Sequence, residues 1–95
     1  MNRDALLDLI RNTVAEFTDG ASPDSIDESM RLFGHDGLLD SIGLVGAIAE
    51  VELRVREQFG GSLVLADERA MSQTRSPFRT VGSLADYALQ VHEPK

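Results

Sequence analysis

Ser41 is the residue of this chain that is best placed to carry chemistry. It follows Asp40 and precedes an apolar run with helical spacing, so it should lie where a loop meets the start of a helix. Backbone N–H groups at a helix start have no partner within the helix, and the helix dipole is positive there. A phosphate carried on the serine would be stabilised by both. The alternative is that Ser41 only serves as the N-cap, a position that serine favours.

Gly43 and Gly46 follow Ser41 within the same helical run. Each weakens the interior of a helix by ~1 kcal/mol relative to alanine. They indicate a close approach to the start of the helix, or at least that no bulky side chain stands beside Ser41.

Two other interpretations of this region have less support. His35, Asp36 and Asp40 could bind a metal ion, but three loosely spaced ligands are poor evidence, and we expect no metal. A hydrolytic set of Ser41, His35 and Asp36 would need a pocket and an oxyanion hole that a small helical chain does not evidently offer. Cysteine is absent, which excludes disulfides, thiolate zinc sites and cysteine nucleophiles.

Three amphipathic helices are expected to position Ser41, over about residues 3–17, 41–59 and 81–91. Their apolar residues recur at short helical intervals: Leu6, Ile10, Val14 and Phe17; Leu44, Ile48, Val51, Val55 and Phe59; and Val81, Leu84, Ala85, Ala88 and Val91. Asp19-Gly20 and Gly60-Gly61 are stop signals for the first two helices, and Thr80 should cap the last.

The helices are joined by long connections. Within residues 19–39, Ser22 and Pro23 favour a short helical turn, with the serine as N-cap and the proline at the first helical position. The apolar residues that should pin this connection to a core are Ile26, Met30, Leu32 and Phe33. A shorter helix is expected over about 66–73. The chain, residues 1–95, is thus predicted to be one all-α domain, a small antiparallel bundle of three main helices plus one short helix.

The net charge restricts the class of partner. It is −7 over 95 residues, which argues against nucleic acid and anionic membrane surfaces and favours basic protein partners. No apolar run approaches the length of a membrane span, and the N-terminus, which contains acids, is unlike a signal peptide. We therefore expect a cytoplasmic protein, and a monomer.

Charge is also uneven along the chain. Residues 19–50 hold seven acids and one base, whereas residues 69–79 hold three arginines and no acid. The candidate partner-binding residues are Asp36, Asp40 and Glu50 from the acidic part, Ile42, Val45 and Ala49 from a second apolar row on the middle helix, and Arg69, Arg75 and Arg79. Completion of the core is an equal alternative for the apolar row. Glu50, Glu52 and Glu57 could pair with arginines of a partner, and a solvated helix face is the alternative. For the three arginines of this chain, the alternative is a solvated surface or pairing within the chain.

The segment around Ser41 resembles the phosphopantetheine attachment motif of the acyl carrier protein family. That motif is Asp-Ser followed by a large aliphatic residue, and here the run Gly37-Leu38-Leu39-Asp40-Ser41-Ile42-Gly43-Leu44-Val45 carries it. Two further pieces are similar to the family in the same order, Glu57-Gln58-Phe59-Gly60 and Thr80-Val81-Gly82-Ser83-Leu84-Ala85-Asp86-Tyr87. The resemblance covers nearly the whole chain. Within the family, the Gly-Leu-Leu-Asp-Ser run and the long segment before the last helix are similar to stand-alone carriers of the D-alanyl type.

The resemblance implies a four-helix carrier fold and a carrier function, so we expect a protein that is not an enzyme and that catalyses nothing itself. A phosphopantetheinyl transferase would attach 4′-phosphopantetheine from coenzyme A to Ser41, and the thiol of this arm would hold an acyl group as a thioester. An acyl- or aminoacyl-loading ligase would supply the cargo, and a downstream acyltransferase or synthase would receive it. The absence of cysteine agrees with this function, because no protein thiol would compete for acyl groups.

Two departures from the family pattern and three alternative functions remain. The 20 residues from Asp40 to Phe59 are about one helical turn more than usual, so the helix is either lengthened or bulged. The stretch 61–79 is also longer than usual. The alternatives are an aminoacyl or peptidyl carrier loaded by a separate adenylating ligase, a cofactor-free acidic helical adaptor, and a small enzyme that uses His35 and Ser41.

Overall fold

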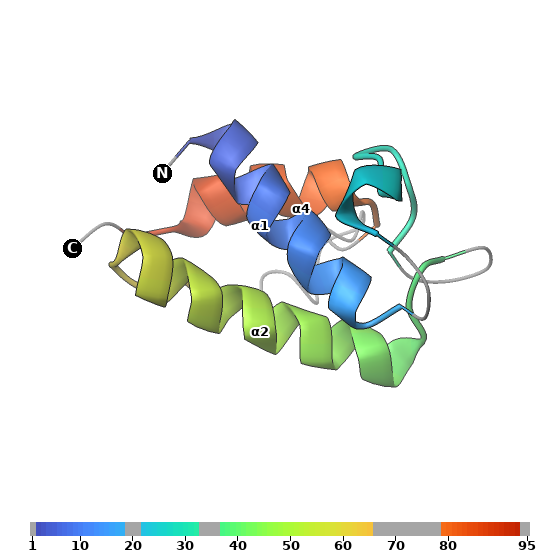
Figure 1. Cartoon of the computed structure of the whole chain (residues 1–95). Helices are drawn as coiled ribbons and strands as arrows, with labels where there is room; N and C mark the ends of the chain where they lie inside the picture. Colours follow the sequence, from blue (N-terminus) through green and yellow to red (C-terminus); the bar gives the residue numbers. More distant parts are fainter. Residues whose placement is uncertain (1, 19–21, 33–36, 66–78, 94–95) are drawn as a thin grey trace.

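A computed structural model of the chain is mostly helical, and it describes residues 2–18, 22–32, 37–65 and 79–93. Within these ranges the α-helices are α1 (Arg3–Glu16), α2 (Ser41–Phe59) and α4 (Val81–Val91), and a 3-10 turn, η1, covers Pro23–Ser25. Helix α1 contacts both other helices, and the start of α2 lies at the same end of the molecule as the end of α1 (Figure 1).

The three long helices lie where the apolar spacing predicts them. Within the described part of the chain there is no strand, only two isolated β-bridges. The short helix expected over 66–73 lies outside the described residues. None of the described helices is long and apolar enough to cross a membrane.

Each long helix begins at a residue whose side chain caps it. Asn2 accepts a hydrogen bond from the backbone N–H of Ala5 at 2.8 Å and so begins α1. Thr80 begins α4 as predicted, and it forms a capping box in which Thr80 and Ser83 each bind the other's backbone N–H. Gly60 ends α2 with a φ of 78°, a left-handed conformation that favours glycine.

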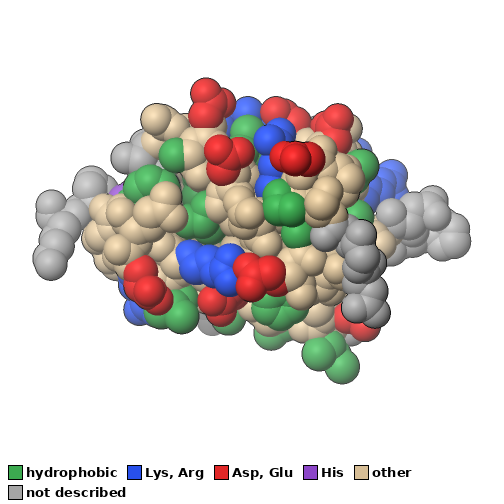
Figure 2. All heavy atoms as spheres, in the orientation of Figure 1, with side chains coloured by type: hydrophobic (Ala, Val, Ile, Leu, Met, Phe, Trp, Pro, Cys, Tyr) green, Lys and Arg blue, Asp and Glu red, His purple; other side chains and the backbone are tan. Residues whose placement is uncertain are grey.

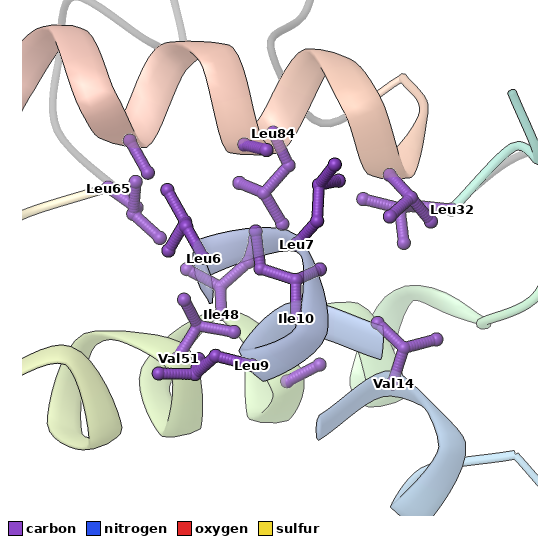
Figure 3. Packing of buried hydrophobic residues seen from close by; sticks show 14 of the residues in the cluster. Leu6, Leu7, Leu9, Ile10, Val14, Leu32, Ile48, Val51, Leu65 and Leu84 are labelled. Carbon is purple, nitrogen blue, oxygen red and sulfur yellow. The ribbon is translucent and has the colours of Figure 1, made fainter. Parts of the chain in front are cut away.

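One hydrophobic core joins the helices. Its residues come from α1, α2 and α4, and side chains from all three meet around Leu6, Ile10, Val51 and Leu84 (Figure 3). The predicted stripes are largely confirmed, because Leu44 and Phe59 are partly buried against this core and Ile48, Val51 and Val55 are fully within it. The exception is Phe17, which caps the end of α1 and is 41% exposed.

The long connection before α2 is anchored in this core. Ile26, Leu32 and Leu39 are buried, whereas Met30 is 37% exposed, so the expectation that Met30 would pin the connection is wrong. Phe33 lies outside the described residues. The backbone oxygen of Met30 accepts from the Val81 N–H at 3.1 Å, next to the antiparallel bridge between Arg31 and Thr80, and the Met30 side chain stays largely exposed.

Backbone hydrogen bonds tie this connection to itself and to the start of α4. Leu32 donates to the Arg79 oxygen at 3.0 Å, and Leu39 donates to the Leu32 oxygen at 2.8 Å. Gly82 donates to the Glu28 oxygen at 2.8 Å. The buried non-helical backbone is therefore paired, as a core position requires.

Truncation of Leu32 tests this anchoring. Leu32→Ala should lower the free energy of unfolding by about 2–5 kcal/mol, because it removes a fully buried side chain. Met30→Ala is the matched control and should cost far less, since Met30 is largely exposed. Urea unfolding followed by circular dichroism measures both variants. Equal losses would show that the connection is not anchored through Leu32.

Candidate functional site

Ser41 is the first residue of α2, and Asp40 is the N-cap. The Asp40 carboxylate accepts a hydrogen bond from the Gly43 N–H at 2.7 Å, and its backbone oxygen accepts from the Leu44 N–H at 2.8 Å. The alternative in which Ser41 itself caps the helix is therefore wrong. Two adjacent residues that both favour capping made this undecidable from the sequence. The N–H groups of Ser41 and Ile42 have no partner within the helix, which is the arrangement that favours an anion.

The two glycines near the helix start lie against other side chains. A Cβ on Gly43 would lie 3.1 Å from the Asp40 carboxylate oxygen that makes the cap. A Cβ on Gly46 would lie 2.8 Å from Cε2 of Phe17, which is too close for any side chain. The close approach expected at these glycines is confirmed, and at Gly46 it is the aromatic ring at the end of α1.

Helix α2 carries an exposed apolar row beside Ser41. Ile42 is 83% exposed and Val45 68%, Ala49 is also exposed, and Leu53 continues the row at 42%. These four residues are called the α2 row below. The alternative in which Ile42, Val45 and Ala49 complete the core is wrong. Leu53 was not predicted, although its spacing of four from Ala49 places it on the same face.

Glu50 interacts within the chain. It is partly buried and accepts a hydrogen bond from Nε of Arg54 at 3.1 Å. The same guanidinium lies 2.6 Å from the Glu16 carboxylate and donates to the Thr13 hydroxyl at 3.2 Å, so it joins α2 to α1. The Glu50 side chain is 34% exposed, so its predicted contact with a partner stays a prediction. The spacing of four between Glu50 and Arg54 on a predicted helix is a sequence signal for their pairing. The contact of Arg54 with Glu16 depends on how α1 packs and has no such signal.

The other acidic residues near these helices differ in whether they make contacts within the chain. Asp40 lies exposed, whereas Glu52 accepts from the Leu65 N–H at 2.6 Å. Glu28 binds Arg3, whose hydrogen bond holds the pKa of the Glu28 carboxyl below its usual range. Glu57 is exposed near the end of α2. Acidic side chains are visible over several parts of the face in Figure 2.

Several candidate residues lie outside the described part of the chain, namely His35, Asp36, Arg69 and Arg75. The side chain of Ser41 is not described either. Arg79 is exposed, and its backbone oxygen accepts the hydrogen bond from Leu32. In the described ranges no three histidine, aspartate or glutamate side chains are grouped as a metal site would need.

Substitution of Asp40 should separate its capping role from its charge. Asp40→Ala should lower the free energy of unfolding by about 1 kcal/mol, because the Gly43 N–H loses its acceptor. Asp40→Asn should retain most of this stability, since an amide oxygen can accept the same hydrogen bond. Urea unfolding measures the difference. If the asparagine variant is as unstable as the alanine variant, the carboxylate stabilises the helix through charge and not as a cap.

Comparison with known proteins adds no relative. The chain matches no protein-family model, no curated protein and no solved structure. Its function therefore has to be inferred from the start of α2 and its surroundings.

Proposed function

We propose that this chain is an acyl carrier protein that holds acyl intermediates as thioesters on a 4′-phosphopantetheine arm attached to Ser41. The observation that carries the proposal is the position of Ser41 as the first residue of α2, directly after a capping aspartate. This position coincides with the Asp-Ser-aliphatic run that resembles the attachment motif of carriers. In the proposed fold, a short helix over 66–73 makes the bundle one of four helices.

The helix start fits a phosphate-linked arm. The Asp40 cap occupies the Gly43 N–H, and the N–H groups of Ser41 and Ile42 have no intrahelical partner, at the positive end of a 19-residue helix. Gly43 adds no side chain at this point. When bound, the arm supplies a thiol that carries the cargo, which the chain lacks because it has no cysteine.

Attachment of the arm is a group transfer performed by a separate enzyme. The serine oxygen forms a phosphodiester with the 4′-phosphopantetheine unit of coenzyme A. The diphosphate bond of coenzyme A breaks, and adenosine 3′,5′-bisphosphate leaves while the hydroxyl proton is lost. The carrier only has to present Ser41, and its own residues hold the helix start in place through the Asp40 cap.

The surface suits partners that bind briefly and release. The net charge of −7 and an exposed Asp40 next to Ser41 steer a basic enzyme surface toward the helix start. The exposed α2 row offers apolar contact beside it. A transferase, a loading ligase and an acceptor enzyme have to use this region in turn, so fast exchange is required. An aminoacyl cargo loaded by an adenylating ligase would use the same site.

Helix α2 is continuous, which supports a lengthened helix in the proposed carrier. The helix is α-helical from Ser41 to Phe59, so the extra turn seen in the sequence lengthens it and does not bulge it. The added turn extends the surface away from Ser41, and it retains the buried face, because four residues are close to the helical period.

Ser41→Ala should abolish attachment of the arm. Intact mass is measured after incubation with coenzyme A, Mg²⁺ and a broad-specificity phosphopantetheinyl transferase. The wild type should gain one arm and Ser41→Ala none. Stability should change by less than about 0.5 kcal/mol, because Asp40 and not Ser41 is the cap.

Ser62→Ala is the matched control, because Ser62 is an exposed serine after α2 that the proposal gives no role. It should gain the arm like the wild type. An arm on Ser41→Ala would show that another residue is modified. A wild type that gains no arm would favour the cofactor-free adaptor instead.

A further inference from the structure

Phe17 extends the apolar surface of α2 onto the end of α1. Its ring lies against α2 at Gly46, where even a methyl group would come within 2.8 Å of the ring. Gly46 is one turn after Ile42 and one turn before Ala49, so the ring adjoins the α2 row. Phe17 is 41% exposed, which leaves part of the ring available for contact.

The α2 row lies on one face of α2 and Phe17 adjoins it at Gly46, and these five residues together are called the apolar patch. Ile42 and Leu53 are eleven residues apart, which corresponds to about 16 Å along the helix axis. Apolar side chains are visible along α2 at the lower edge of the molecule in Figure 2. Single exposed apolar residues are ordinary, but a contiguous patch on a small domain marks an interaction surface.

The two ends of the patch carry opposite charges. Asp40 is exposed at the Ser41 end, and Arg56 is exposed in the last turn of α2, about 24 Å along the axis. On the flank near Phe17, Arg54 is bound to Glu16 and Glu50. The complementary surface has an apolar centre, a cation near Ser41 and a carboxylate at the far end.

The occupant of the patch is an unlike protein and not a second copy. Each chain carries a net charge of −7, so two copies repel each other, whereas a basic enzyme is attracted. An enzyme that acts on Ser41 must also approach this end of α2.

We propose that Phe17 is a specificity-determining contact for enzymes that act on Ser41, so that their docking face crosses from α2 onto the end of α1. This inference rests on the carrier function proposed above. Gly46 is the positioning residue, because its lack of a side chain lets the ring lie against α2 beside the α2 row.

The test measures arm attachment by a broad-specificity phosphopantetheinyl transferase with coenzyme A and Mg²⁺. Phe17→Ala should lower kcat/KM about fivefold, through a higher KM with kcat retained. Leu53→Ala should act in the same direction, and Phe17→Leu should recover most of the loss because it restores apolar contact. Met30→Ala, an exposed apolar residue on the connection, is the control and should stay within about twofold of wild type.

Four results would overturn the inference. Wild-type kcat/KM in Phe17→Ala and Leu53→Ala, with normal attachment to Ser41, would contradict it and leave the carrier function intact. A fall of kcat together with the melting temperature, unrelieved by Phe17→Leu, would make Phe17 a packing residue only. A concentration-dependent dimer in sedimentation that Phe17→Ala abolishes would assign the patch to a second copy. Absence of any arm on wild type would remove the carrier function and this inference together.

Discussion

The burial of the connection before α2 is the constraint on which the rest of the structure depends. A non-helical segment can enter a core only if its backbone N–H and C=O groups form hydrogen bonds. Here the Leu32 N–H donates to the Arg79 oxygen, and the Leu39 N–H donates to the Leu32 oxygen. Leu39 is buried, and the next residue, Asp40, caps α2. The place of Ser41 therefore follows from the anchoring of the residue two positions before it.

Helix α2 has one apolar face that is buried in the core and a second apolar face that is exposed. Its buried face, which includes Val51 and Val55, packs in the core, and Arg54 ties its flank to α1 through Glu16. The α2 row lies on the remaining face and contributes nothing to the core. In a small domain without disulfides, the loss of four apolar residues from the core is substantial. In the proposed carrier, these exposed residues would form the surface that meets other proteins.

The sequence predicted those features that depend on local spacing. The three long helices follow from apolar residues at intervals of three and four, and the Thr80 cap and the glycine stop after Phe59 follow from local chemistry. Features that depend on packing were not predictable. Phe17 fits the stripe of α1 by spacing, yet it lies past the last helical residue and packs on Gly46. The sequence cannot decide which of the two apolar rows on α2 is buried until α1 is in place. Arg54 reaches Glu16 only in the folded chain.

Peptide mapping of the modified protein tests the carrier proposal most directly. Cleavage after arginine releases the peptide Leu32–Arg54, in which Ser41 is the only residue with a hydroxyl side chain. After incubation with coenzyme A, Mg²⁺ and the transferase, this peptide should carry the mass of one 4′-phosphopantetheine arm, and fragmentation should release the arm from Ser41. An unmodified Leu32–Arg54 peptide, or an arm found on any other peptide, would contradict the proposal.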